Sequence, residues 1–589
     1  MTVREAVFDL LRAFGVTRIF GNPGSTELPM FRDFPRDFRY VLGLQESIVV
    51  GMADGYAAAS GGPAFVNLHS AIGVGHALGG IFTAFRNQTP LVITAGQQAR
   101  SILPFEPFLY SEQATNLPKP YVKWSCEPAR AEDVPLAVAR AFYAAMQPPR
   151  GPALVSVPVD DWDRPCESVK PREVSRVVLG DPALLARAAA SMNRARQPVV
   201  VVGAGVARDK AWQETVLLAE RHQARVWVSP LSARNSFPEN HRLFAGFLPA
   251  NRARIVECLR EADFILVIGA PVFTYHMEGS GPHIPEGASL VQLVDEPGMA
   301  AWAPVGLAIV TSLKLGVQAL LDQSAPGPRA APPSWERAPA QPPDRLTDRY
   351  LLQRIAALRP PGSIVVEEAP SSRGSMHDHL PMFEPDTFFT CASGGLGHGL
   401  AAAVGVALAR PERKVIALLG DGSAMYSIQG LWSAAELGLP VVFIIIKNGG
   451  YDALTEFGAL FGMPDLQTEA ASHRLLRPRA QPGCGQPARR AMRRARRRAG
   501  RCIPRRRADA DRGGGDTGQL ALWFSSRLRQ FPVRVCGRRA TSFHRIAHCT
   551  VGREAFAVVR AARHAIAVGS TEIRVRRQWT HEKRRPPSS

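Results

Sequence analysis

Oxygen ligands follow two successive apolar strands in the last third of the sequence. Asp421 lies in a Gly-Asp-Gly turn that ends one predicted strand, and Asn448 ends the next, 27 positions later. Carboxylate and amide oxygens suit Mg²⁺, which completes its octahedron with phosphate oxygens and water. Gly422 and Gly449 allow the backbone to approach a diphosphate, and the helix after the turn directs its N-terminus at the anion. A lone Asp-Gly is commonly only a turn, but the spaced pair predicts a metal–diphosphate site.

Four further residues are candidates for acid–base chemistry or substrate binding. Glu46 lies inside the apolar run LGLQESIVVGMA, where a helix-surface glutamate is less expected than a functional acid, although a paired core acid is also compatible with the run. His69 and His276 each follow a predicted strand, where ligand sites collect, although a single histidine there is more often structural. Ser25 lies in the turn GNPGS, as a ligand-binding hydroxyl or as a helix N-cap.

The elements that must position these residues alternate between short apolar strands and helical patterns, which predicts α/β domains on parallel sheets. We expect domains at residues 1–165, 182–321 and 346–465, with a Pro-rich linker that makes few contacts at 322–345. The ligand site is expected at the edge of the third sheet where its strand ends open. The GAG at 203–205 lacks the third glycine of a dinucleotide fingerprint and is interpreted as a turn.

The formal net charge of +20 comes from the end of the chain. Residues 466–589 hold 29 arginines and one lysine against seven acids, whereas residues 1–465 carry a net charge of −3. An arm that binds nucleic acid is expected to mix lysine with arginine and to interleave aromatics. Translation of a GC-rich gene in a shifted reading frame yields arginine without lysine. One choice of codons for residues 473–477, read one base later, encodes Ile-Asp-Phe-Cys, which is a plausible helix start for an α/β domain. We therefore predict a disordered, frameshifted tail without a specific nucleic-acid partner.

Other sequence features argue against membrane and secreted classes. The best candidate apolar run, VVFIII at 441–446, is far shorter than the roughly 18 residues of a membrane span. The eight cysteines form no CxxC pairs, and the first residues lack a basic-then-apolar export signal. A cytoplasmic location without a membrane partner is expected.

Taken together, the motifs resemble those of the thiamine-diphosphate enzymes. GDGSAMYS and KNGGY look like that family's diphosphate–metal signature. The other matching stretches are most similar to the benzoylformate decarboxylases of the family: GNPGSTELP, LQESIVVGMADGYA, PAFVNLHSAIGVGHALG, LVITAGQQAR and LVIGAPVFTYH. The resemblance covers about residues 1–463 and implies three doubly wound parallel-sheet domains. These are a pyrimidine-binding domain (1–165), a middle domain (182–321) and a diphosphate-binding domain (346–465).

The resemblance implies thiamine diphosphate and Mg²⁺ as cofactors. Asp421, Asn448 and the Gly450 carbonyl correspond to the Mg²⁺ ligands, and Leu396 to the bulky residue that bends the coenzyme. The other implied cofactor-binding residues are Asn22, Gly420, Gly422 and Ser423. Glu46 corresponds to the acid that hydrogen-bonds the pyrimidine ring of coenzyme held by a second subunit, so a homodimer or homotetramer with active sites between subunits is expected.

The implied reaction is the nonoxidative decarboxylation of a small-molecule 2-oxo acid, with benzoylformate giving benzaldehyde and CO₂, as in the mandelate pathway. His69 and His276 correspond to proton relays, and Ser25 to the residue that binds the substrate carboxylate. Leu454 and Phe457 match apolar pocket positions. One alternative is an acetolactate-synthase-like carboligase, which the two histidines disfavour; another is a catalytically inactive frameshift product.

Three positions depart from the family pattern. Lys447 stands where most relatives have asparagine, Thr390 where an aromatic is expected, and Pro370-Ser371 where two hydroxyl residues are. A chain out of frame after about residue 463 also loses the helix and strand that close the third sheet, which exposes an apolar edge.

Overall fold

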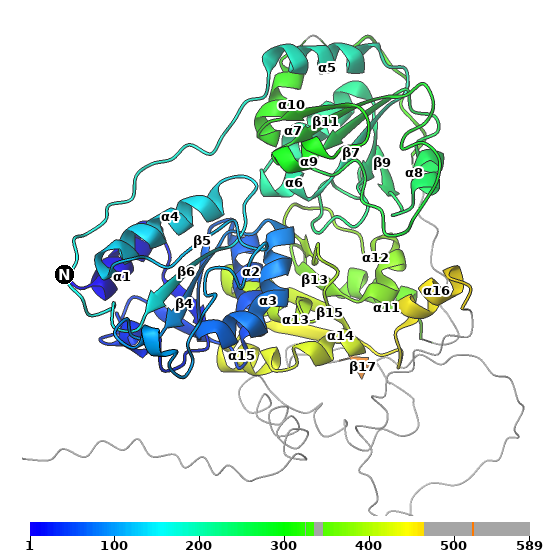
Figure 1. The fold of residues 1–589 in the computed structure, drawn as a ribbon. Helices are drawn as coiled ribbons and strands as arrows, with labels where there is room; N and C mark the ends of the chain where they lie inside the picture. Colours follow the sequence, from blue (N-terminus) through cyan, green and yellow to red (C-terminus); the bar gives the residue numbers. More distant parts are fainter. Residues whose placement is uncertain (324, 335–345, 464–520, 523–589) are drawn as a thin grey trace, which may run out of the picture.

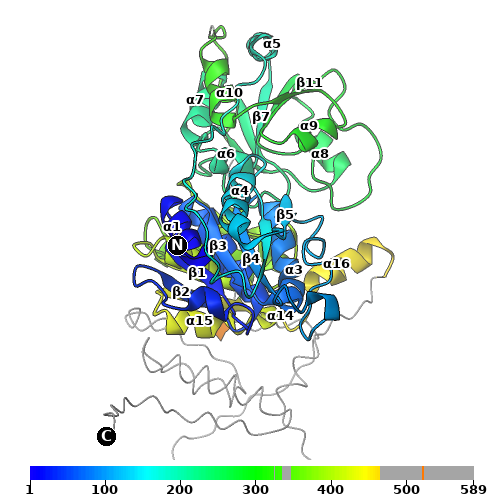
Figure 2. The same ribbon diagram turned by 60° about the vertical axis from the view of Figure 1, so that its left-hand side comes forward.

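The computed structural model describes residues 1–323, 325–334, 346–463 and 521–522. These residues form three sheets with helices on both faces, and all but one of the strand pairings are parallel. The predicted fold class is therefore confirmed, while the domain boundaries stay predictions. In Figures 1 and 2 the second domain lies above the other two, which lie side by side.

The first sheet has six parallel strands, in the order β2 (Arg39–Leu42), β1 (Arg18–Gly21), β3 (Ala64–Leu68), β4 (Leu91–Gln97), β6 (Ala153–Pro158) and β5 (Trp124–Cys126). One face is covered by α2 (Glu46–Ser60) and α3 (Ser70–Asn87), the other by α1 (Val3–Ala13) and α4 (Val134–Met146). Short 3₁₀ turns are η1 (Leu28–Phe31), η2 (Leu103–Phe105) and η3 (Ala131–Asp133). Because both faces are covered, central strands such as β3 are buried at every residue.

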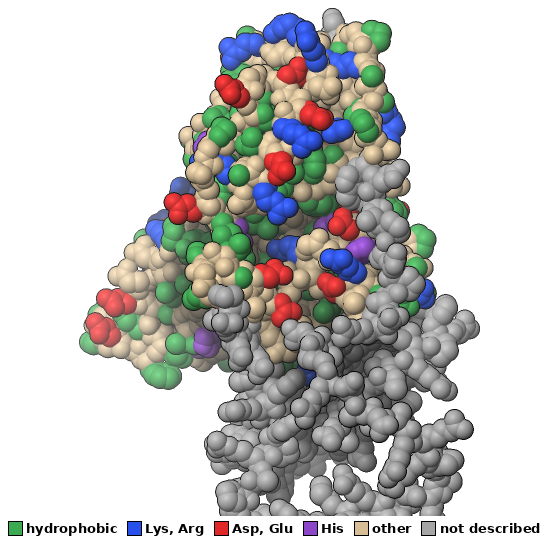
Figure 3. Space-filling view, turned by 90° about the vertical axis from the view of Figure 1, so that its right-hand side faces the viewer, with side chains coloured by type: hydrophobic (Ala, Val, Ile, Leu, Met, Phe, Trp, Pro, Cys, Tyr) green, Lys and Arg blue, Asp and Glu red, His purple; other side chains and the backbone are tan. Residues whose placement is uncertain are grey.

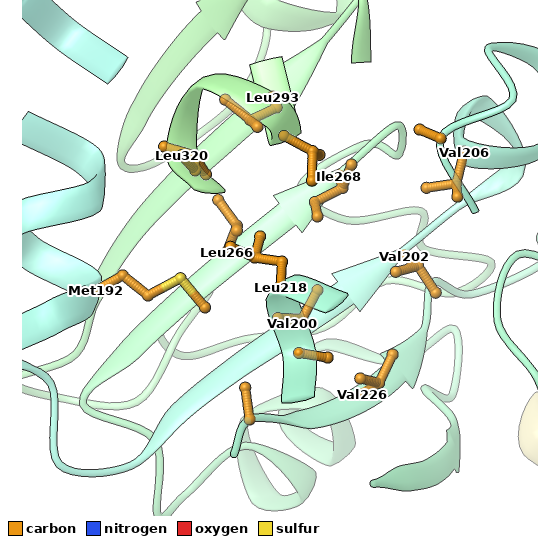
Figure 4. Close-up of a cluster of buried hydrophobic side chains, with 14 of the residues drawn as sticks. Met192, Val200, Val202, Val206, Leu218, Val226, Leu266, Ile268, Leu293 and Leu320 are labelled. Carbon is orange, nitrogen blue, oxygen red and sulfur yellow. The ribbon is translucent and has the colours of Figure 1, made fainter. Parts of the chain in front are cut away.

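The second sheet runs β12 (Leu307–Val310), β11 (Ser289–Val294), β10 (Phe264–Ile268), β7 (Pro198–Val202), β8 (Arg225–Val228) and β9 (Phe244–Phe247). Its helices are α5 (Pro182–Arg194), α6 (Ala204–Arg208), α7 (Trp212–His222), α8 (Arg252–Cys258), α9 (Pro297–Ala301) and α10 (Leu313–Leu321). Figure 4 shows the core under α5, α7 and α10, where Met192, Leu218 and Leu320 meet the strands. A Cβ on Gly203, at the end of β7, would lie 2.5 Å from that of Ala270. Gly203 is the N-cap of α6, so the GAG segment begins a helix and the interpretation as a turn is wrong.

The third sheet runs β14 (Phe388–Phe389), β13 (Ile364–Glu368), β15 (Val415–Gly420), β16 (Val441–Ile446) and β17 (Ala521–Leu522). Its helical elements are α11 (Asp348–Leu358), η4 (Pro370–Ser372), α12 (Arg373–His379), α13 (Gly399–Ala409), α14 (Asp421–Tyr426), α15 (Gly430–Glu436) and α16 (Asp452–Leu460). The two-residue β17 pairs antiparallel with Ile444 and Ile445, on the edge that the sequence predicts to be exposed. The remainder of the tail, with its predicted disorder and frameshift, lies outside the described residues.

Helices α2 and α13 join the first and third domains (Figure 1). Glycine makes this crossing possible: a Cβ on Gly405 would lie 1.9 Å from the carbonyl oxygen of Met52, and one on Gly55 would lie 2.2 Å from that of Ala402. Backbone therefore packs directly on backbone, and the start of α13 is held in a fixed relation to α2.

The described part of the linker is tied to the second domain. Arg329 donates to the backbone oxygens of Met192, Asn193 and His222 at 2.7, 2.8 and 3.2 Å, so the expectation of few contacts does not hold there. Over the face seen in Figure 3, basic and acidic side chains are interspersed on the described residues. In the described part of the chain no helix has both the length and the apolar character to cross a bilayer.

Candidate active site

The ends of β1 and β3 bring the first group of candidate residues together. Gly21 pairs with Asn67 in these parallel neighbours, so Asn22 and His69 emerge at the same edge of the sheet. His69 occupies the N-cap position of α3, and Glu46 is the first residue of α2. Three segments that are distant in sequence thus place polar side chains at one sheet edge, where α/β folds bind ligands.

Glu46 is buried and held by two side chains. Its side chain is 9% exposed; Asn22 Nδ2 donates to Oε1 at 3.3 Å, and His76 Nδ1 lies 3.0 Å from Oε2. The acid is therefore paired, as the core alternative requires, yet its partners come from the same strand-end cluster.

His69 is held by a buried carboxylate that the sequence analysis did not assign. Its Nδ1 lies 2.8 Å from Glu27 Oε2 and 3.2 Å from the Thr26 hydroxyl oxygen. Glu27 is 1% exposed and accepts the Gly24 N–H at 2.8 Å. A carboxylate on Nδ1 favours the tautomer that leaves Nε2 free to accept a proton. The only sequence signal was an acid in the GNPGSTELP motif.

Ser25 is exposed and lies two residues before Glu27, the cap position of η1, where no side-chain cap bond forms. Ser25 therefore does not cap this turn, and the helix-cap alternative is wrong. Gly24 next to it has no room for a side chain, because a Cβ would lie 2.2 Å from His69 Nδ1.

A second group of candidate residues lies at the third sheet. Gly420 of β15 pairs with Ile446 of β16, so Asp421 and Asn448 follow neighbouring parallel strands and reach the same edge. Asp421 Oδ1 accepts the Gly422 N–H at 3.0 Å, and Asn448 Oδ1 accepts the Gly450 N–H at 3.3 Å. Both oxygens that the sequence nominates as ligands thus lie at adjacent strand ends. Ser423 follows in α14 and is buried.

The loop that carries Leu396 is fixed on both sides. Before it, Ala392 N–H donates to Asn87 Oδ1 at 2.8 Å; after it, the N–H groups of Gly397 and Gly399 donate to the carboxylate of Glu368. Burial raises the pKa of the Glu368 carboxyl, and these N–H bonds oppose the shift. Leu396 itself lies half-buried between the anchors.

His276 of the second domain reaches the third. Its ring meets that of Phe457 in α16 edge-on, with centroids 4.5 Å apart, and Leu454 on the same helix is 53% exposed. Among the described residues, the hydrogen bonds of Glu46 and His69 stay within the first domain, whereas those of Asp421 and Asn448 stay within the third. We therefore treat the candidate residues as two groups, called half-sites: one on the first domain, and one on the third domain with His276.

The unusual Thr390 has a structural explanation. Its hydroxyl donates to Glu367 Oε2 at 2.8 Å and accepts from Arg373 Nη2 at 3.0 Å. Arg373 also bonds Glu367 at 2.8 Å, and the charge of Glu367 raises the pKa of the guanidinium. A buried polar cluster replaces the expected aromatic. Ser371 is exposed, with its hydroxyl oxygen 3.5 Å from Asn448 Nδ2; nothing in the structure explains Lys447.

Models of three protein-family domains match successive segments of the chain. "Thiamine pyrophosphate enzyme, N-terminal TPP binding domain" matches residues 1–115, the central domain of the same enzymes matches 185–320, and their C-terminal TPP binding domain matches 370–474. These three segments end at residue 474, so nearly all of the Arg-rich tail lies outside them.

Curated relatives and solved structures agree with this assignment. Benzoylformate decarboxylase of Pseudomonas aeruginosa is 47% identical over 470 residues, which are 79% of this chain and 89% of the relative. The crystal structure of benzoylformate decarboxylase from Polynucleobacter necessarius has a TM-score of 0.78 at 40% identity and covers 80% of this chain and 90% of its own. A thiamine diphosphate-dependent 4-hydroxybenzoylformate decarboxylase from Rhodococcus jostii RHA1 has a TM-score of 0.77 at 41% identity, with coverage of 80% and 91%. An acetolactate synthase large subunit from Haemophilus influenzae is more distant, at 27% identity over 75% of this chain and 82% of its own. The chain belongs to the thiamine pyrophosphate enzyme family.

Proposed function

We propose that this protein is a thiamine-diphosphate-dependent decarboxylase of aryl 2-oxo acids, with benzoylformate as the substrate to test first. The observation that carries the proposal is the pairing of Gly420 with Ile446, which brings Asp421 and Asn448 to one sheet edge. The high identity to a benzoylformate decarboxylase supports the reaction type over the acetolactate synthase chemistry of the more distant relative.

The donor set fits Mg²⁺ in its chemistry. Asp421 offers a carboxylate, Asn448 an amide oxygen and Gly450 a backbone carbonyl, and diphosphate oxygens and water complete the octahedron. No group of three or more His, Cys, Asp or Glu side chains suited to a metal occurs among the described residues. A magnesium–diphosphate site does not need one, because a single carboxylate suffices.

The chain's own residues supply binding and proton transfer. The bound coenzyme supplies a nucleophilic carbon and an electron sink for the loss of CO₂. Glu46 would hold the coenzyme by a hydrogen bond to its pyrimidine ring nitrogen, the position from which an acid can support the acid–base chemistry that the coenzyme supplies. His69, with Nδ1 held by Glu27, accepts and returns a proton at Nε2. Ser25 binds the substrate carboxylate. His276, whose ring contacts that of Phe457, relays a proton from the half-site on the third domain.

We propose a homodimer or homotetramer in which each active site combines the half-sites of two subunits. Large apolar side chains near both half-sites are exposed in the single chain: Leu28, Ile72, Phe105, Phe108, Met425, Tyr426 and Phe461. Exposed apolar surface of this kind marks interaction sites. Light scattering coupled to gel filtration measures the assembly, and a strictly monomeric, active protein contradicts it. The four free cysteines of the described residues fit the cytoplasmic location that we also propose.

The test is an assay of the full chain with Mg²⁺, thiamine diphosphate and benzoylformate. Release of benzaldehyde is expected, and absence of turnover with every aryl and alkyl 2-oxo acid tried contradicts the proposal. Acetolactate formed from pyruvate instead would identify the carboligase alternative. A frame-restored version serves as the matched control, because turnover by it alone identifies the chain as an inactive frameshift product.

A further inference from the structure

A second histidine lies against the acid of the first half-site. His76 is on α3, seven residues after His69, the N-cap residue of that helix. Gly73 lies between them, and a Cβ there would already be in contact with Glu46 Cγ at 3.4 Å. Glu46 therefore lies across α3 beside Gly73, within reach of His76.

The contact is direct, and in the single chain it leaves the histidine open to solvent. His76 Nδ1 is 3.0 Å from Glu46 Oε2, and the His76 side chain is 57% exposed while that of Glu46 is 9% exposed. The other oxygen, Oε1, accepts from the neutral amide of Asn22. In the described part of the chain, His76 is thus the titratable side chain that hydrogen-bonds Glu46.

Other charges on the elements packed against α3 are occupied elsewhere. On α2, Asp54 bonds Asn87 and His398; on α3 itself, Arg86 lies at the far end, in the last turn. Strand β4 carries no charged residue. At the start of α3, His69 bonds Glu27, so among the described residues the titratable side chain in direct contact with the Glu46 carboxylate is His76.

We propose that His76 is a titratable positioning residue that controls how strongly Glu46 hydrogen-bonds the coenzyme's pyrimidine ring. This inference rests on the proposed function. A neutral imidazole donates one hydrogen bond to Glu46 and leaves its basicity largely intact. A protonated imidazole is a cation beside the carboxylate, where it stabilises the anion and lowers its affinity for a proton.

Deuterium exchange at the reactive carbon of bound thiamine diphosphate reports this effect before any substrate reacts. In the wild-type full chain with Mg²⁺, the exchange rate should fall on acidification through the histidine range. For His76→Asn, which keeps a neutral donor, the rate at pH 8 should match the wild type. At pH 6 it should exceed the wild type by about tenfold, the effect of one nearby charge in a partly hydrated site. The dissociation constant of the coenzyme, from tryptophan fluorescence, should show the same difference in pH dependence.

The matched control is His241→Asn, because His241 Nε2 forms a similar contact, 3.1 Å from Glu220 Oε1, in the second domain. Its exchange profile should follow the wild type. His76→Gln is a second non-titrating variant in case asparagine disturbs α3. Parallel pH profiles for wild type and both His76 variants overturn the inference while leaving the proposed function intact. Failure of the wild type to bind thiamine diphosphate at all overturns both.

Discussion

The seam between the first and third domains contains a buried ion pair that can be tested by mutation. His398 Nε2 lies 3.0 Å from Asp54 Oδ2, with side-chain exposures of 8% and 1%, and Asn87 Nδ2 donates to the same oxygen at 2.7 Å. Removing one partner of a buried pair leaves an uncompensated charge and costs about 3–5 kcal/mol. Asp54→Ala should therefore lower the melting temperature by about 10 °C at pH 6.

The cost should depend on pH in a defined direction. Burial alone lowers the pKa of His398, but the hydrogen bond to Asp54 and its charge outweigh burial, and the charge of Glu368 adds to them; the pKa therefore lies above its ordinary value. A raised pKa in the folded state means that the pair contributes fully below about pH 6.5 and that the contribution is lost as pH rises through the folded-state value. Asp54→Asn, which removes the charge but keeps an oxygen acceptor, should be clearly destabilised at pH 5.5 and less destabilised at pH 9.

Differential scanning fluorimetry at both pH values measures these shifts. Asp37→Asn is the control, because Asp37 pairs with Arg12 at 2.7 Å on the surface with half of its side chain exposed, and should change the melting temperature little. An equal loss of stability by Asp54→Asn at pH 5.5 and pH 9 would refute the charged-pair reasoning.

Three further predictions concern the seam and the two half-sites. Gly405→Ala should destabilise by about 1–3 kcal/mol in thermal melts, because its Cβ would lie 1.9 Å from a backbone oxygen of α2; Gly79→Ala, which meets nothing within 4 Å, is the control, and equal effects contradict the clash. Glu27→Gln should lower kcat by about 10²-fold in steady-state assays, since the buried carboxylate 2.8 Å from His69 Nδ1 sets its tautomer; a change below twofold would remove Glu27 from the machinery. Chelation of Mg²⁺ by EDTA should release thiamine diphosphate, and Asp421→Asn should raise the Mg²⁺ concentration needed to retain it in equilibrium dialysis; binding that is indifferent to both argues against the metal site.

Much of the architecture follows from local sequence. Fully buried strands such as β3 read as continuous apolar runs, and successive parallel strands end at the same edge of a sheet. That rule places Asp421 and Asn448 at the same edge of the sheet, because Asp421 directly follows β15 and Asn448 lies two residues after the end of β16. The positions of Glu46 and His69 at helix starts after strand ends follow from the same alternation.

The tertiary structure decided which side chains hold these residues. Glu27 on His69 and His76 on Glu46 both lay in motifs that the sequence analysis quoted, yet nothing in the residue pattern assigned them a role. Such contacts depend on the relative rotation and register of packed elements, which the hydrophobic periodicity of any one element leaves open.

The Asp54–His398 pair is even harder to predict from the sequence, because its two residues belong to different domains. The pair exists only because glycines let α2 and α13 cross at backbone contact. Sequence by itself therefore determined the fold class, the strand-end positions and the coenzyme chemistry of this protein. Packing between elements decided the proton partners, since a hydrogen bond requires two groups within about 3 Å whatever their separation along the chain.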